Sequence, residues 1–453
     1  MPLEWTQFPL ATVGEISESV VFSALLISAT VIFLTSQIWA ETCAWLRLPP
    51  VLGQLIGGLL LGVSALKILV FAEGDAAINP AVISLIQQTT EADAEIALTA
   101  YSHQLIAISE GAANLGVVAL LFLIGLESDF ESLLKVGPQA AIVATAGVVL
   151  PLVGGTVGLI TLFGTPLLPA IFGGAALTAT SIGITAKVLK DLGQLQSTEG
   201  QIIIGAAVLD DLLGILILAL VVSLVKEGSI NVAGLGWLLL STAIFVGSVV
   251  LLRSPVAQAF TALNSWLRSE NSLLISGIVF ALMMAAIANA LHLEAILGAF
   301  AAGIMLSGTA QRQQLLERFE PIAGILAPIF FIVVGAKTDL SVLNPANPDS
   351  ATGLGMAACL IVIAVLGKGV ASYLMPRAGE LNRLAIGIGM VPRGEVGLVF
   401  VGIGSAIGMS EELTAAIILM VVVTTLVAPL LLRWTLPAAN APAPITQVPL
   451  SGN

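Results

Sequence analysis

The chain has 453 residues, of which 57% are hydrophobic and 10% charged, and its mean hydropathy is +1.05. This composition lies outside the range of soluble domains and indicates an integral membrane protein. The formal net charge of -12 excludes a basic nucleic-acid-binding surface, and two cysteines in separate apolar segments give neither a disulfide framework nor a metal-binding spacing.

Apolar runs of about 17 to 25 residues predict the membrane spans in chain order. An outer tail, 1–18, lacks the basic start of a cleaved signal peptide, so we expect the first span to be retained. Thirteen spans are predicted, at 19–41, 49–67, 107–126, 138–161, 166–187, 199–225, 232–252, 272–291, 294–308, 321–336, 353–376, 382–408 and 413–435. The membrane domain is therefore expected over 19–435, followed by a short cytoplasmic tail, 436–453, with no regulatory domain.

The basic residues predict the orientation of these spans. Eleven Lys and Arg residues fall in loops on one side of the predicted membrane, and three fall on the other: Lys67, Lys226 and Lys337. Because cytoplasmic loops carry an excess of Lys and Arg, the N-terminus is expected outside and the C-terminus inside. The two remaining basic residues, Lys368 and Arg393, fall within predicted spans.

Two pairs of stretches suggest an internal repeat. "LPPVLGQLIGGLLLG" (48–62) is similar to "LEAILGAFAAGIMLS" (293–307), and "LFLIGLESD" (121–129) is similar to "FIVVGAKTD" (331–339). These matches join spans separated by seven, an odd number, so the two copies would run in opposite directions across the membrane, as in many secondary transporters. The alternative is chance similarity between Gly- and Leu-rich helices. The predicted repeats cover about 49–225 and 294–435.

Two stretches that this repeat would match are poor uninterrupted helices. An offset of 214 residues places "TATSIG" (178–183) on "PRGEVG" (392–397). Hydroxyl residues and glycines weaken the first helix, and Pro392 with two glycines weakens the second, so both are expected to unwind within the membrane. A simple proline-kinked helix is the alternative at either place.

The same offset places Asp210 and Asp211 on Thr424 and Thr425. A buried, unpaired carboxylate is costly in hydrocarbon, so an acid within a span is expected to face water, a partner or an ion. Neighbouring helical residues point about 100° apart, so the two aspartates can serve different partners. Such a pair can bind either protons or a small cation, whereas two interfacial acids reaching for water are the structural alternative.

Seven stretches of the chain together match a known family pattern: "LRLPPVLGQLIGGLLLG", "LLFLIGLESD", "LTATSIGITAKVL", "GAAVLDDLLGI", "PIFFIVVGAKTDL", "LGKGVAS" and "GMVPRGEVGLVF". Through them the chain resembles the second family of monovalent cation:proton antiporters, which includes NapA-type sodium/proton antiporters and the membrane part of KefC-like proteins. The resemblance implies an all-α polytopic membrane protein with about thirteen transmembrane helices, inverted repeats, a six-helix core with two crossed broken helices, and a dimerisation panel. The broken helices would be 166–187 and 382–408.

The family's site residues carry over to matching positions. By resemblance, Asp211 binds the transported cation and exchanges it for a proton, and Asp210 pairs with Lys368 of "LGK". Thr180 and Ser181 would offer oxygen ligands to the cation, because hard cations prefer oxygen.

Two further charges lie at the expected helix crossing. Arg393 and Glu395 are expected to compensate helix ends or to pair with other buried charges, while a purely structural role is the alternative.

The predicted function is secondary active antiport, most simply exchange of Na+ for H+ by alternating access, with no cofactor and with Na+ at Asp211 and Asp210. Lys368 is expected to couple transport to a second proton, and the alternative is a permanent structural cation with one H+ exchanged for one Na+. K+/H+ antiport, a cation channel and an anion-coupled symporter are the alternatives, and Li+ is a possible further substrate. The resemblance also implies a homodimer in the lipid bilayer of a bacterial-type plasma membrane or another energy-coupled membrane such as the thylakoid, without a nucleic-acid partner and without enzymatic activity.

Overall fold

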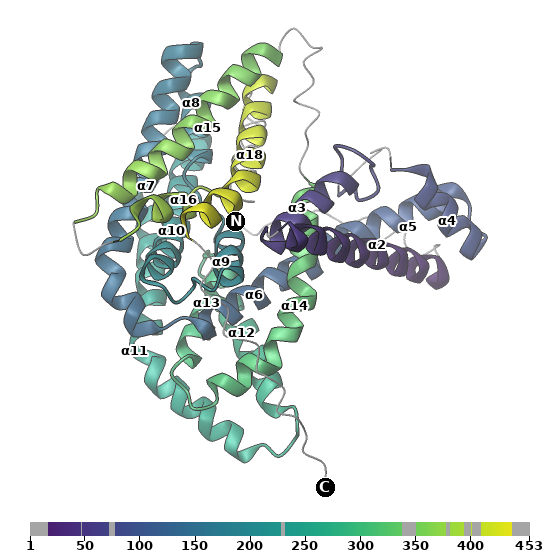
Figure 1. Ribbon diagram of the computed structural model, residues 1–453, viewed down its shortest axis with the longest axis horizontal. Helices are drawn as coiled ribbons and strands as arrows, with labels where there is room; N and C mark the ends of the chain where they lie inside the picture. The colour runs from purple at the N-terminus through teal and green to yellow at the C-terminus, as the bar shows by residue number, and fades with distance from the viewer. Residues whose placement is uncertain are drawn as a thin grey trace. The chain divides into compact units, whose positions relative to one another are not determined.

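The computed structural model describes residues 17–46, 48–71, 78–227, 232–337, 350–376, 381–393, 400 and 409–436. Every regular element within these ranges is a helix (Figure 1). By length and composition, nine of the described helices are long and apolar enough to cross a membrane. The chain is therefore an all-α polytopic membrane protein, as its composition predicts.

The helices group into two compact units, and the first combines residues 1–117 with 324–341. Its helices are α2 (Glu18–Trp45), α3 (Pro50–Leu61), α4 (Pro80–Thr90), α5 (Ala94–Ala107), a π-helical turn (Ile108–Ala112), the start of α6 (Ala113–Glu127) and the end of α14 (Arg312–Ala336). Proline begins both α3 and α4, where its missing N–H removes no helical hydrogen bond.

The second unit contains residues 118–323 and 342–453 and holds the predicted site. Besides the rest of α6 and α14, its helices are α7 (Phe130–Phe163), α8 (Leu167–Ala176), α9 (Ile182–Asp191), α10 (Thr198–Glu227), α11 (Val232–Trp266), α12 (Ser272–Ala290), α13 (Ala295–Leu306), α15 (Ser350–Tyr373), α16 (Arg383–Gly389) and α18 (Glu411–Thr435). Helix α15 packs along both α7 and α18, and α10 packs along α7 (Figure 1).

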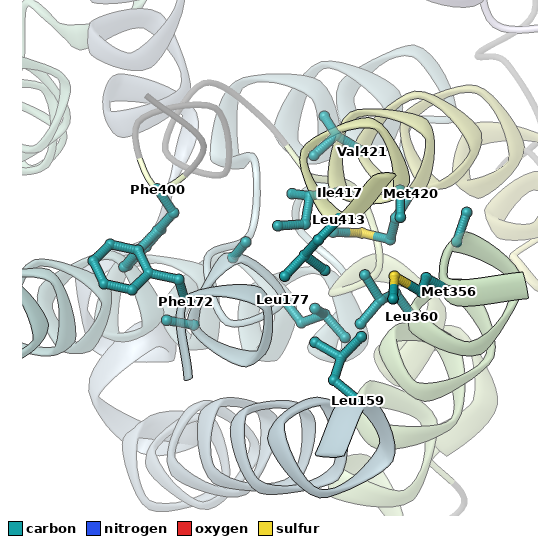
Figure 2. Packing of buried hydrophobic residues seen from close by; sticks show 14 of the residues in the cluster. Leu159, Phe172, Leu177, Met356, Leu360, Phe400, Leu413, Ile417, Met420 and Val421 are labelled. Carbon is teal, nitrogen blue, oxygen red and sulfur yellow. The ribbon is translucent and has the colours of Figure 1, made fainter. Parts of the chain in front are cut away.

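A buried apolar cluster joins α7, α8, α15 and α18 within this unit (Figure 2). Its labelled members are Leu159, Phe172, Leu177, Met356, Leu360, Phe400, Leu413, Ile417, Met420 and Val421. The rings of Phe172 and Phe400 meet edge to face, with centroids 6.5 Å apart. Because lipid tails are as apolar as these side chains, close packing rather than escape from water stabilises the cluster. The cluster packs tightly against α8.

Each of the thirteen predicted spans contains a described helix, although their number as membrane crossings stays a prediction. Four of the predicted spans contain only short helices. These are α3, α13, the pair α8 and α9, and α16. Helix α4 was not predicted, because its 11 residues are too few to cross a bilayer and end in polar side chains.

Two glycine pairs occur at corresponding places in the predicted repeat, which matches α3 with α13 and α6 with α14. In the first unit, Gly58 of α3 lies against the backbone of Gly335 in α14. In the second unit, Gly303 of α13 lies in the same way against Gly125 of α6. A Cβ at any of these four positions would stand within 2.4 Å of a backbone carbonyl oxygen, so only glycine permits such close approach.

The bounds of α3 and α13 also correspond. A single offset of 245 residues maps the first and the last residue of α3 onto those of α13.

Candidate functional site

The first predicted broken helix is interrupted in the structure. Helix α8 ends at Ala176, α9 begins at Ile182, and the five residues between them are not helical. Thr178, Thr180 and Ser181 in this gap are buried, with at most 8% of each exposed. Backbone groups freed within a membrane need other partners, and the hydroxyl of Thr178 turns back to donate to the carbonyl of Ala175 at 2.8 Å.

The second broken segment supplies the missing partners. Helix α16 ends at Gly389 and the chain continues without helix to Arg393, the last described residue before a gap. The amide of Ser181 donates to the carbonyl of Pro392 at 2.9 Å, and the hydroxyl of Thr180 donates to the carbonyl of Met390 at 3.0 Å. The two interruptions therefore lie against each other, and donors of the first break satisfy backbone carbonyls of the second.

A third bond between the two segments was not predicted. The hydroxyl of Thr185, one turn into α9, donates to the carbonyl of Gly389 at 2.9 Å. The carbonyl at the end of α16 is thereby satisfied by a side chain of the other broken helix, which fixes the register of the crossing.

A buried ion pair lies beside this crossing. The ammonium Nζ of Lys368, on α15, is 2.8 Å from Oδ1 of Asp210, on α10, and neither side chain is exposed. The same ammonium donates to the carbonyl of Thr178 at 2.9 Å, so it also binds the unwound backbone of the first break. Oδ2 of Asp210 has no hydrogen-bond partner within the part of the chain that the structure describes. The pairing expected for these two residues is therefore present.

Asp211 lies next to this pair and is 4% exposed. Its charge acts on Lys368 together with that of Asp210. One turn further along α10, the backbone of Gly214 approaches the side chain of Ala179 in the first break. Helix α10 thus passes the unwound segment with both aspartates at the level of the crossing.

Arg393 is fully buried at the end of the second break. Its Nη1 donates to the carbonyl of Met390 at 2.9 Å and to the hydroxyl of Thr180 at 3.4 Å. Among the described residues, no carboxylate lies within ion-pair distance of it. The guanidinium therefore lies against the carbonyl end of α16, and the charge compensation expected for it there stays a prediction. Glu395 lies outside the described residues, so its role stays a prediction.

The sequence profile of the family described as "Sodium/hydrogen exchanger, transmembrane" matches residues 17–438. The chain belongs to this family. It is 51% identical over 415 residues to the high-affinity Na+/H+ antiporter NhaS3 of Synechocystis sp., covering 91% of the chain and 90% of that relative. It is 30% identical to the Na+/H+-K+ antiporter GerN of Bacillus cereus, covering 90% of the chain and 95% of GerN.

A solved structure shares the fold of this family member. The sodium proton antiporter MjNhaP1 of Methanocaldococcus jannaschii aligns with a TM-score of 0.61 over 93% of the chain and 100% of MjNhaP1. The two sequences are 14% identical, so this similarity concerns the fold alone.

This exchanger family member has a second charged cluster at the end of α6. Lys190 of α9 lies 2.5 Å from Glu127 and 3.2 Å from Glu320. Arg312 donates to the carbonyls of Leu126 and Glu127 at 2.7 and 2.9 Å. These ion pairs hold the end of α9 against α6 and α14. Lys190 entered the sequence-based prediction only as one of the basic residues that orient the chain, so this contact was not predicted.

Proposed function

We propose that this family member is a secondary active antiporter that exchanges Na+ for H+ by alternating access. The observation that carries the proposal is the buried group of Asp210, Asp211 and Lys368 beside two crossed, interrupted helices. Charges within a membrane protein are costly and mark ion pathways, and unwound backbone at a crossing of half-helices is a usual place for ion sites. The relatives named as Na+/H+ antiporters support the choice of ions.

In the proposed mechanism, Asp211 holds either a proton or Na+. A site that holds one or the other, but not both, crosses the membrane loaded with Na+ in one direction and with H+ in the other. This competition couples the two fluxes, because the empty, charged carboxylate is too costly to carry across the hydrocarbon. Asp211 needs to be deprotonated when Na+ binds and protonated when it leaves.

Asp210 and Lys368 would control how strongly the site attracts Na+. While the ammonium is bound to Asp210, one of the two negative charges is neutralised. When Na+ arrives, Lys368 would release its proton, and both carboxylates would face the ion. A lysine in an apolar interior loses its proton more readily than one in water, which makes this second proton chemically accessible.

The unwound segment would complete the coordination of Na+. The hydroxyl of Thr180 donates its hydrogen to Met390 and accepts a long hydrogen bond from Arg393 at 3.4 Å, which leaves one lone pair of its oxygen available as a ligand. Ser181 and the carbonyls of the first break would supply further oxygens, the ligand type that hard cations prefer. Arg393 would remain charged in both loaded states.

A proton-flux measurement tests the proposal. Everted vesicles with an internal acid pH and a pH-sensitive dye should show proton release on addition of Na+, with Li+ and K+ tested in parallel. Absence of cation-dependent proton movement would overturn the antiport proposal. Cation flux without any opposing proton movement would indicate a channel instead.

K+/H+ exchange is the second candidate, and the name of GerN, an Na+/H+-K+ antiporter, favours including it. A response to K+ larger than that to Na+ in the same vesicles would identify it.

The orientation and the assembly are part of the proposal. We expect the N-terminus outside and the C-terminus in the cytoplasm, a homodimer, and an energy-coupled membrane of the plasma-membrane or thylakoid type. The excess of basic residues on one side supports the orientation.

A further inference from the structure

A glycine of α7 lies against the side chain of Lys368. A Cβ built on Gly147 would stand 3.0 Å from Cδ of Lys368 and 3.3 Å from its ammonium nitrogen. Gly147 is buried in the interior of α7, and its backbone is helical. Because alanine is more stable than glycine in the middle of a helix, the chain gives up helical stability at this position. What it gains there is space for a charged side chain.

The space left by the missing side chain of Gly147 determines the position of the Lys368 ammonium. Lys368 reaches Oδ1 of Asp210 at 2.8 Å and the carbonyl of Thr178 at 2.9 Å. A methyl group on α7 would overlap the end of the lysine chain by a few tenths of an ångström. The ammonium would have to move, and hydrogen bonds to charged groups weaken as distance and angle depart from their optimum.

Other glycines of α7 meet α15 differently. A Cβ on Gly158 would stand 3.0 Å from Cδ1 of Ile363 and 3.3 Å from Sγ of Cys359, the same two distances as at Gly147. Those neighbours carry no formal charge and belong to the packing of α7 against α15. Gly158 is therefore a sterically matched position at which only packing is affected.

We propose that Gly147 is a positioning residue for transport: its missing side chain sets the Lys368 ammonium against Asp210 and the unwound backbone. The inference rests on the proposed function, because it deepens the role given there to Lys368. The charged groups that act on Lys368 are Asp210 and Asp211 of α10 and Arg393 after α16. Displacing the ammonium weakens its bond to Asp210, so the two carboxylates attract Na+ more strongly.

The Na+ dependence of exchange tests the proposal. Parent, Gly147→Ala and Gly158→Ala proteins are reconstituted in liposomes, and Na+-driven proton flux is measured against Na+ concentration at one fixed pH. We expect the half-maximal Na+ concentration of Gly147→Ala to fall by roughly threefold or more, since a hydrogen bond between charged groups contributes the equivalent of about tenfold in affinity. Gly158→Ala should keep the parent value. Equal values for the two variants would overturn the inference.

A stability measurement covers the case in which Gly147→Ala folds poorly or the parent shows no flux. Thermal melting in detergent is compared for Gly147→Ala alone and for the same substitution added to Asp210→Asn/Lys368→Ala. The inference predicts that the added methyl lowers the melting temperature in the parent and has no such effect once the lysine is truncated. An equal loss in both backgrounds would mean that Gly147 serves packing only. A parent without Na+-dependent flux would refute the proposed function. The melting comparison would still test whether Gly147 positions Lys368.

Discussion

The first broken-helix region, α8 to α10, and the second, α15 to α18, differ in the charged side chains that they place at their crossing. Helix α8 ends at Ala176, and the 214-residue offset places that end next to the end of α16 at Gly389. The backbone is thus interrupted at matched positions. Among the described residues, however, the first region contributes two buried carboxylates, Asp210 and Asp211, while the second contributes two buried cations, Lys368 and Arg393.

The positions matched to the aspartates show how the second region differs. Thr424 and Thr425 are buried like the acids, with 1% and 5% exposed. The hydroxyl of Thr425 donates to the carbonyl of Arg393, within the second break. A threonine therefore satisfies backbone where the first region has an ionisable group. The difference is consistent with the proposal of one ion site between two similar scaffolds, rather than one site in each.

The largest expected effect comes from removing the charge of Asp211, so that this position is uncharged like Thr425, its match in the second region. Asp211→Asn keeps the shape of the side chain and removes its negative charge and its exchangeable proton. We expect Na+-dependent proton flux in proteoliposomes to vanish, while thermal melting and size-exclusion behaviour stay near those of the parent. Parent-like flux in this variant would show that the carboxylate of Asp211 does not carry the exchanged ion.

The amino-acid sequence predicts much of this comparison. Apolar runs locate the helices because a helix that crosses the bilayer needs about 20 mostly apolar residues, and such a run is visible in the hydropathy of the sequence. The weak helix at 178–183 corresponds to the observed interruption at 177–181, since glycines and hydroxyl residues lower helical stability locally. The pair Lys368–Asp210 was expected from the resemblance and is present at 2.8 Å.

Contacts fixed by the crossing itself could not be predicted. The second acceptor of Lys368 is a backbone carbonyl, that of Thr178, and any residue type carries such a group. The bond from Thr185 to Gly389 joins positions 204 apart and depends on how the half-helices cross. Gly147 could not be singled out either, because the sequence does not say that its neighbour is a charged side chain.

The next effect concerns the ion pair in which Asp210 of the first region and Lys368 of the second neutralise each other. Asp210→Asn leaves the buried ammonium of Lys368 without its anion, and Lys368→Met leaves Asp210 without its cation. Each change should lower the free energy of unfolding by about 3–5 kcal/mol, the usual cost of stranding a buried charge. The double variant should recover much of that loss. Thermal or denaturant unfolding in detergent measures all three.

A double variant no more stable than either single variant would contradict this mutual neutralisation. It would mean that the two side chains contribute separately, through packing or through other partners. Both single variants should also change the apparent Na+ affinity in proton-flux measurements.

A smaller effect tests whether the charge difference between the regions is carried across the membrane. With H+ bound, Asp211 is neutral and Lys368 balances Asp210, so these three groups sum to zero. With Na+ bound and Lys368 deprotonated, the ion and the two carboxylates sum to minus one. Arg393 adds the same charge to both states and cancels. Each cycle would then exchange two protons for one Na+ and gain about 2.3 kcal/mol per 100 mV of membrane potential.

Proteoliposomes with an imposed potassium-valinomycin potential measure this coupling. Under a sodium gradient and no pH gradient, the proton flux should change with the sign of the potential. A rate and an endpoint indifferent to the potential would mean one proton for one Na+, with Lys368 as a permanent cation.

The smallest effect comes from removing the hydroxyl that the second region has in place of an acid. Thr425→Val leaves the buried carbonyl of Arg393 without this donor, which should cost about 1–2 kcal/mol of unfolding free energy. Thr424→Val is the matched control, because the hydroxyl of Thr424 donates only to carbonyls of its own helix, Met420 and Val421 at 2.8 and 3.0 Å. Those carbonyls lie inside a helix, and this type of back-bonding adds little stability. Melting in detergent should therefore separate the two adjacent variants, with Thr425→Val the less stable and both still able to exchange Na+ for H+. Equal melting temperatures would show that the Thr425 hydroxyl does not support the second break, and loss of exchange in Thr425→Val alone would mean that the second region contributes directly to the ion site.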